Sequence, residues 1–319
     1  MALRFPIVLD GGFATELERQ FGKDLTGKLW SAKCLDEDPD AVKAIHRSYF
    51  EAGSNVATTC SYQATIEGFL EAGYTLTKAQ ELMKKSVSLA RDARDDFKNS
   101  HPTDTQPRLI ALSMGCYGAK LANGAEYTGD YGAITKHDLI RFHKDRLVLF
   151  LQEPGIDLIL FETIPSSLEA EAIHDLIKTW APSDTTPSLP PMAVSFSCQS
   201  NDRISDGALL EQCVAFYDDL ESVVGLGVNC TKLQYIPSLV SILVAKQQHS
   251  GKAVVLYPDG GGIWDAKERN WIQGSKMSPE RFCEMVTNVM GECGTNIMVG
   301  GCCGTEVAHI RLLSHNMPS

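Results

Sequence analysis

Short apolar runs alternate along the chain with segments of helical periodicity. Eight of these runs have the length and composition of buried strands, at residues 7–10, 54–60, 108–114, 156–162, 192–197, 223–229, 253–257 and 296–300. Each run is followed by a polar or glycine-rich turn and then by a helical pattern. Because eight strands alternating with helices are typical of a (β/α)8 barrel, the pattern predicts a single TIM barrel of the α/β class. Its active site is expected at the C-terminal ends of the strands.

The predicted helices carry start signals of their own, which favour the same fold. A helix start is marked by a small polar residue at the N-cap, followed by proline at the first position or by Glu or Gln at the third. Such signals are Asp38 with Pro39, Thr77 with Gln80, Ser166 with Glu169, and Ser278 with Pro279. They predict where helices begin and carry no information about function.

Length and charge narrow the classes of function. With 319 residues, 44% of them hydrophobic, the chain can bury a large core, and we expect one domain over residues 1–319. A formal net charge of −11 without any basic run argues against a nucleic-acid partner, whose phosphates need clustered Lys and Arg. No apolar run approaches the ~20 residues of a membrane span, and the N-terminus lacks a secretory pattern. We therefore expect a cytoplasmic protein without a membrane partner.

Cysteines follow several of the predicted strands, but three of the ten stand in glycine-containing segments there, whereas many of the others lie inside apolar patterns typical of packing. Cys230 follows the strand at 223–229, and Cys302 and Cys303 follow the strand at 296–300. Three thiolates that converge at strand ends would suit zinc and leave one coordination position open. The spacing alone leaves two other interpretations open, namely buried thiols that only pack and a vicinal pair that senses redox state.

Nine short segments occur in a fixed order along the chain: Leu9-Asp10-Gly11-Gly12, Leu29-Trp30-Ser31-Ala32, Ala52-Gly53-Ser54-Asn55, Ser61-Tyr62-Gln63-Ala64, Glu126-Tyr127-Thr128-Gly129-Asp130-Tyr131, Phe161-Glu162-Thr163-Ile164-Pro165, Gly227-Val228-Asn229-Cys230, Tyr257-Pro258-Asp259 and Gly300-Gly301-Cys302-Cys303. Together they resemble the homocysteine S-methyltransferase family over nearly the whole chain. The branch that uses S-methylmethionine or S-adenosylmethionine as methyl donor is the most similar. The resemblance implies a homocysteine-binding barrel and an S-methyltransferase that forms methionine.

The resemblance also implies the metal site and the reaction. Zn²⁺ is expected on Cys230, Cys302 and Cys303, with the homocysteine sulfur as fourth ligand. A free thiol of pKa ~8.5 is mostly protonated at neutral pH, whereas a zinc-bound thiol loses its proton. The bound sulfur would attack the sulfonium methyl group directly, so we expect no protein side chain to act as catalytic acid, base or nucleophile.

Substrate binding is expected at other strand ends. By resemblance, Asp10 and Glu162 bind the homocysteine ammonium group, and Thr59 and the backbone at Gly11 help to position the amino acid. Two carboxylates can hold a cationic amine without any proton transfer. The residues alone leave simpler roles open, since Asp10 could shape a turn and Glu162 could cap the following helix.

The donor pocket is predicted from the same resemblance. Betaine-using relatives carry tyrosines where this chain has Gln63 and Thr163, which removes part of an aromatic cage for a quaternary ammonium ion. Trp30 remains as one aromatic wall. The loop at 117–136, with Tyr127 and Tyr131, is expected to help enclose the donor, although these tyrosines could equally be packing anchors.

Two alternative functions remain. One is a betaine-using homocysteine methyltransferase, and the other is a non-catalytic barrel that senses redox state through zinc or its thiols. Asp10 and Glu162 favour an enzyme, because a sensor needs no carboxylates that bind an amino acid. The expected partners are therefore homocysteine and a sulfonium donor; the choice between the two sulfonium donors and the oligomeric state stay open.

Overall fold

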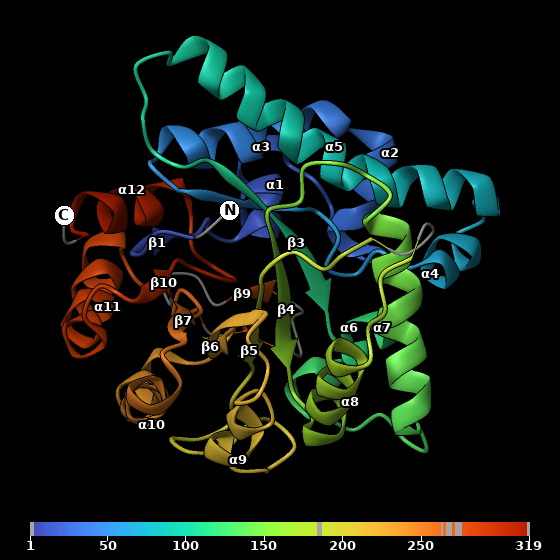
Figure 1. Ribbon diagram of the computed structural model, residues 1–319. Helices are drawn as coiled ribbons and strands as arrows, with labels where there is room; N and C mark the ends of the chain where they lie inside the picture. Colours follow the sequence, from blue (N-terminus) through green and yellow to red (C-terminus); the bar gives the residue numbers. More distant parts are fainter. Residues whose placement is uncertain (1–2, 184–186, 263, 266–269, 272–275, 318–319) are drawn as a thin grey trace.

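One parallel sheet of eight strands forms the centre of the molecule (Figure 1). The computed structural model describes residues 3–183, 187–262, 264–265, 270–271 and 276–317. The strands are β1 (Ile7–Val8), β2 (Val56–Thr58), β3 (Leu109–Gly115), β4 (Leu158–Ile164), β5 (Met192–Phe196), β6 (Val223–Asn229), β7 (Ala253–Tyr257) and β10 (Ile297–Val299). They pair in the order β1-β10-β7-β6-β5-β4-β3-β2, so the predicted TIM barrel is confirmed.

Helices alternate with these strands and surround the sheet (Figure 1). They are α1 (Phe13–Phe21), α2 (Cys34–Glu37), α3 (Pro39–Glu51), α4 (Ile66–Glu71), α5 (Leu76–Ser100), α6 (Tyr117–Leu121), α7 (Lys136–Phe150), α8 (Ser167–Lys178), α9 (Leu210–Ala215), α10 (Ile236–Ser250), α11 (Pro279–Cys293) and α12 (Val307–His315), with short 3₁₀ helices η1 (Trp30–Lys33), η2 (Ala125–Tyr127) and η3 (Leu233–Tyr235). An antiparallel pair that the sequence did not predict, β8 (Trp264–Asp265) and β9 (Asn270–Trp271), follows β7.

Among the described residues, no helix has the length and apolar character needed to cross a membrane. The predicted domain bounds of 1–319 include terminal residues outside the described ranges and stay a prediction.

Three of the four predicted helix starts are confirmed, at Asp38, Ser166 and Ser278. The Asp38 side chain accepts a hydrogen bond from Ala41 N at the start of α3, and Ser278 does the same for Arg281 N at the start of α11. The prediction for α5 is wrong by two residues, because Thr75 and not Thr77 is the N-cap. Thr75 has the extended backbone of an N-cap and its side chain accepts from the third helical N–H, whereas the capping-box spacing with Gln80 favoured Thr77.

The predicted capping box of α8 is also wrong. Ser166 makes no side-chain capping bond, and Asp206, from the segment after β5, accepts hydrogen bonds from the N–H and hydroxyl of Ser167. A carboxylate at a helix N-terminus interacts favourably with the helix dipole, so Asp206 serves as the cap. Glu169 is buried instead against His143, at 2.8 Å from its Nε2.

The barrel has separate inner and outer cores. An inner cluster consists of strand residues that share one face of the sheet, Ile7, Leu9, Val56, Leu109, Ala111, Leu158, Leu160, Ala193, Val255, Tyr257 and Met298. A larger cluster packs the other face against the helices. Since side chains alternate along a strand, the next inward positions at the C-terminal ends of β3, β4 and β5 are the polar residues Ser113, Glu162 and Ser195. The inner core thus changes from apolar to polar toward the mouth of the barrel.

Side chains help to close the barrel between β1 and β2. Val8 N donates to Asn55 Oδ1 at 2.8 Å, and Asn55 N donates to Val8 O at 2.7 Å. At the mouth, the N–H and hydroxyl of Thr58 donate to the two carboxylate oxygens of Asp10, at 2.6 and 2.7 Å. Asp10 therefore joins two strands in addition to any role in binding.

Arg146 on α7 holds the loops that follow β2 and β3. Its buried guanidinium donates to the carbonyl oxygens of Ser61, Tyr62, Ala64 and Gly115 at 2.8 to 3.2 Å. These loops carry residues predicted to bind substrate, so one side chain fixes part of the mouth from outside the barrel.

We expect Arg146→Met to lower the free energy of unfolding by about 3 kcal/mol or more, because it leaves buried carbonyl groups without a donor. The matched control is Arg141→Met on the same helix, where an exposed pair with Asp138 is lost and less than about 0.5 kcal/mol is expected. Urea unfolding of both variants measures the difference. Equal, small losses in the two variants would contradict the role assigned to Arg146.

Candidate active site

The three predicted cysteines meet at the mouth of the barrel. The sulfur atoms of Cys230, Cys302 and Cys303 lie within 4.8 Å of one another, and those of Cys230 and Cys303 are 3.7 Å apart. Two sulfurs bound at ~2.3 Å to a tetrahedral zinc ion would be about 3.8 Å apart, so these residues fit the metal. In this structure Cys230 and Cys302 form a disulfide, which must be reduced before both can serve as ligands.

The backbone after β7 joins the two loops that carry these cysteines. Cys230 N donates to Tyr257 O at 3.3 Å, Cys302 N donates to Pro258 O at 2.9 Å, and Gly260 N donates to Cys303 O at 2.8 Å. Since β7 lies between β6 and β10, its loop acts as a spacer that sets the separation of the sulfurs.

The surroundings of Cys303 disfavour a thiolate unless a cation is present. The pKa of Cys303 is raised to about 12, mainly by burial and also by the carboxylates of Asp259 and Glu126, while an interaction with the Tyr127 hydroxyl opposes the shift. A bound dication would reverse this balance, because metal coordination deprotonates a thiol.

The structure brings the two predicted carboxylates into one buried region. Burial raises the pKa of Asp10 to about 7, hydrogen bonds from Thr58 oppose this shift, and the charge of Glu162 adds to it. Burial also raises the pKa of Glu162, against hydrogen bonds from Ser113 and Tyr257. Glu162 lies within β4 and does not cap the following helix. Binding of an ammonium group by these two side chains stays a prediction.

Sequence reasoning missed a buried polar network beside these carboxylates. Asn229 Oδ1 accepts from Thr163 N and from the Ser195 hydroxyl, both at 2.8 Å, and Asn229 Nδ2 donates to Thr163 Oγ1 at 2.7 Å. The Ser195 hydroxyl is also 2.6 Å from that of Tyr257, which donates to Glu162 at 3.2 Å. The two-residue alternation of each strand was the signal that could have found Ser195, Asn229 and Tyr257, since each is polar at an inward position.

Asn229 restrains two residues with unusual backbone conformations. Thr163 has a φ of +59°, and Cys230, the next residue after Asn229, has a φ of +45°. Such conformations are costly for residues with a side chain and persist where surrounding contacts hold them. The network therefore holds the β4 and β6 loops in the shape that faces the mouth.

Thr59 and Gly11 lie at the mouth but make structural contacts. The Thr59 hydroxyl accepts from Ser113 N at 3.0 Å and is 2.7 Å from the Ser61 hydroxyl. A Cβ on Gly11 would lie 2.9 Å from the Tyr49 hydroxyl, so the backbone there packs closely against α3. Their expected contacts with homocysteine stay predictions.

Four of the five predicted donor-pocket residues surround this region. Trp30 packs edge-on against Tyr62 with ring centres 6.1 Å apart, and Tyr62 in turn interacts with the Thr163 side chain. Gln63 donates from Nε2 to Ala119 O at 2.8 Å, and the half-exposed Tyr127 lies beside Cys303. Contact of these residues with a methyl donor stays a prediction.

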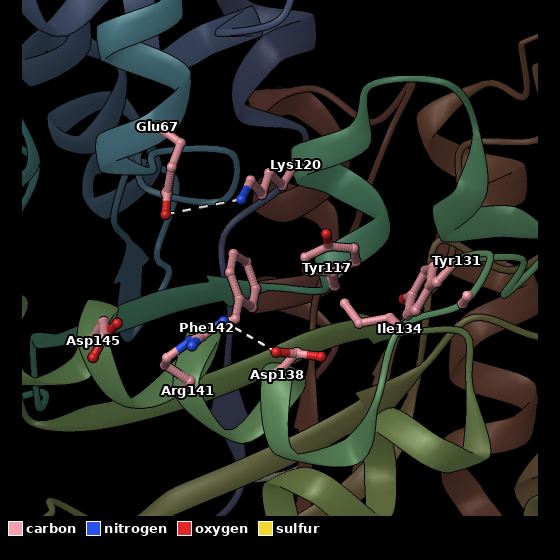
Figure 2. Close-up of a pocket in the computed structure, with 10 residues that line it drawn as sticks. Glu67, Tyr117, Lys120, Tyr131, Ile134, Asp138, Arg141, Phe142 and Asp145 are labelled. Atoms are coloured by element: carbon pink, nitrogen blue, oxygen red, sulfur yellow. Dashed lines mark hydrogen bonds and ion pairs between the residues drawn. The ribbon is translucent and has the colours of Figure 1, made fainter.

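Tyr131 faces a different cavity, a surface pocket of about 460 Å³ at α7 (Figure 2). The segment at 117–136, predicted as a loop, contains α6 and η2. The Tyr131 hydroxyl donates to Glu169, which also accepts from Tyr117 N at 2.7 Å. These contacts agree with the packing interpretation of Tyr131, and its proposed part in donor binding stays a prediction.

Known proteins show the same fold and sequence pattern. Residues 7–317 match the model of the family described as homocysteine S-methyltransferase. The chain belongs to this family. This methyltransferase is 38% identical over 320 residues to a selenocysteine Se-methyltransferase of Brassica oleracea var. italica, covering 98% of this chain and 89% of that one. It is 39% identical over 307 residues to homocysteine S-methyltransferase YbgG of Bacillus subtilis (strain 168), covering 96% and 92%.

A solved structure agrees with this membership. The metallated form of the homocysteine methyltransferase MmuM from Escherichia coli superposes with a TM-score of 0.81 at 31% identity, covering 98% of this methyltransferase and 96% of MmuM. An oxidized form of MmuM gives the same TM-score and identity. The prediction of an S-methyltransferase is thereby confirmed, and family membership argues against the alternative of a non-catalytic redox sensor.

Asp10 should make the ligand-free methyltransferase less stable as the pH rises. Its pKa is about 7 in the folded state against 3.8 for the ordinary side chain, so the folded state binds the proton more strongly. The stabilisation is present at low pH and is lost as the pH rises through about 7. Between about pH 5 and pH 8, wild type should lose about 3 kcal/mol more unfolding free energy than Asp10→Asn. Urea unfolding under reducing conditions measures both, and parallel pH profiles would refute the assignment.

Proposed function

We propose that this enzyme transfers a methyl group from a sulfonium donor, S-methylmethionine or S-adenosylmethionine, to the sulfur of homocysteine and so forms methionine. The observation that carries the proposal is the convergence of Cys230, Cys302 and Cys303 at a mouth that also contains the buried carboxylates of Asp10 and Glu162. We further propose that the three cysteines bind Zn²⁺. The metallated form of a homocysteine methyltransferase among the similar structures supports this proposal. A cytoplasmic location stays a prediction.

Zinc, when bound, would supply a Lewis-acidic centre that keeps the homocysteine sulfur deprotonated at neutral pH. The protein would hold the rest of homocysteine through its ammonium group, with Asp10 and Glu162 as acceptors. A lone pair of the homocysteine sulfur forms the new bond to the methyl carbon. The carbon–sulfur bond of the donor breaks, and its electrons neutralise the departing sulfonium sulfur. No side chain has to transfer a proton during this step.

The charge at the mouth favours a cationic donor. Four carboxyl groups, those of Asp10, Glu126, Glu162 and Asp259, act on one another or on the cysteine sulfurs. A sulfonium ion gains from this field, and the neutral thioether that leaves does not. Betaine is also cationic at nitrogen, but Gln63 and Thr163 provide no aromatic cage for it.

Methionine formation should depend on zinc and on Cys230. Chelation, or Cys230→Ala, should remove the metal and lower the rate by at least about 100-fold, because one of three thiolate ligands is lost. Cys213→Ala is the matched control, since Cys213 is buried on α9 and is not part of the cluster. Metal content and methionine formation from homocysteine are measured on the same samples. Methyl transfer to selenocysteine is measured as well, because one similar protein is a selenocysteine Se-methyltransferase. Full activity after complete metal removal would refute the proposed zinc role.

Glu162→Gln should weaken homocysteine binding while zinc is retained. Loss of a charge-assisted hydrogen bond to the ammonium group costs about 1.5–3 kcal/mol, so KM for homocysteine should rise roughly 10- to 100-fold. The metal content should not change, because Glu162 is not one of the three clustered ligands. Exposed Glu67→Gln on α4 is the control. An unchanged KM for homocysteine in Glu162→Gln would count against its assigned contact.

A further inference from the structure

Two buried acceptor oxygens near the mouth have no hydrogen-bond partner among the residues that the structure describes. They are Oε1 of Gln63, in the loop after β2, and Oε2 of Glu126, in the segment after β3. Buried polar atoms in proteins are nearly always hydrogen-bonded, so an unpaired acceptor at a candidate active site marks a place for a donor from water, an ion or a ligand. The amide oxygen of Gln63 is always an acceptor, and the carboxyl oxygen of Glu126 is an acceptor when the group is ionised. Both oxygens therefore require an N–H or O–H donor.

Contacts with α6 fix the orientation of both residues. Gln63 donates from Nε2 to Ala119 O at 2.8 Å, and because a carbonyl can only accept, Oε1 must point away from it. Glu126 is held at its backbone, where its carbonyl accepts from the Ser197 hydroxyl at 2.8 Å. A Cβ on Gly118 would lie only 2.5 Å from Glu126 N. Gln63 and Glu126 thus pack against the same turn of α6.

The Glu126 carboxyl group lies near the mouth of the barrel, within electrostatic range of Cys303. Its charge acts on Cys303, after β10, and on Tyr62, after β2, so the carboxyl group is within electrostatic range of two separate strand ends. Tyr62 is the residue against which Trp30 packs. Burial is the main cause that raises the pKa of Glu126, as expected for a carboxyl group that has lost water without gaining a cation.

We propose that Glu126, assisted by Gln63, binds the α-ammonium group of the methyl donor and selects sulfonium donors that carry an α-amino group. The proposal rests on the function proposed above and adds a second ammonium subsite to the one expected at Asp10 and Glu162. A sulfonium centre has no N–H to offer an acceptor, whereas an α-ammonium group has three. The quaternary nitrogen of betaine has none, so these two oxygens also disfavour betaine.

The test compares two donors that differ in this group. S-Methylmethionine carries the α-ammonium, and dimethylsulfoniopropionate is a sulfonium carboxylate without it. For Glu126→Gln, KM for S-methylmethionine should rise about 10- to 100-fold, the loss expected for a charged hydrogen bond, while KM for homocysteine stays within about twofold. The constant for dimethylsulfoniopropionate, measured as KM or as a competitive inhibition constant, should not change. Gln63→Met should show a smaller loss with the same selectivity.

Asp130→Asn is the matched control, because Asp130 is an exposed acid in the same segment and should leave both donors unaffected. Equal losses for the two donors in Glu126→Gln, or no loss for either, would overturn the assignment. The donor preference of the wild-type enzyme is a second test that needs no variant. Tighter binding of dimethylsulfoniopropionate than of S-methylmethionine would also overturn the assignment. Wild-type protein that forms no methionine with any sulfonium donor would refute the proposed function, and this assignment with it.

Discussion

The parallel pairing of β6, β7 and β10 is the constraint on which the candidate site depends. The cysteines follow β6 and β10, which are not adjacent in the sheet, and β7 must separate these strands by the correct distance. The close approach of β6 to β7 requires glycine, because a Cβ on Gly227 would lie 1.7 Å from Val255 O. The loop after β7 then bonds to both cysteine loops. Three sulfurs within 4.8 Å of one another are the result.

Acidic groups at the mouth combine structural and chemical roles. Asp10 joins β1 to β2 through Thr58 and also interacts with the charge of Glu162. Glu162 ends a chain of hydrogen bonds that passes through Tyr257 and Ser195 to Asn229, the residue before Cys230. The proposed amino-acid site and the proposed metal site are thus linked by side chains across four neighbouring strands. Such a network is rigid because every member is held by another.

Most of the fold could be predicted because strands buried on both faces are nearly continuous apolar runs. Helix starts were less predictable. Thr77 has the capping-box spacing with Gln80 although Thr75 is the N-cap, and Glu169 has the spacing of a capping residue but is buried against His143 and Tyr131. Tertiary contacts of this kind override local preference, since a buried charge gains more from a fixed partner than from a helix end.

The sequence by itself determined the eight strands, the strand-end position of the three cysteines, and the resemblance that indicates the family. These features are local, because the hydrophobic pattern of a buried strand and the residues of a turn each occupy a short stretch of the chain. Only the tertiary structure decided that Asp10 joins two strands, that Asn229 restrains Thr163, and that Gln63 and Glu126 keep unpaired oxygens near the mouth. Each of these depends on contacts between residues far apart in the chain, whose distances follow from closure of the barrel and not from spacing along the chain.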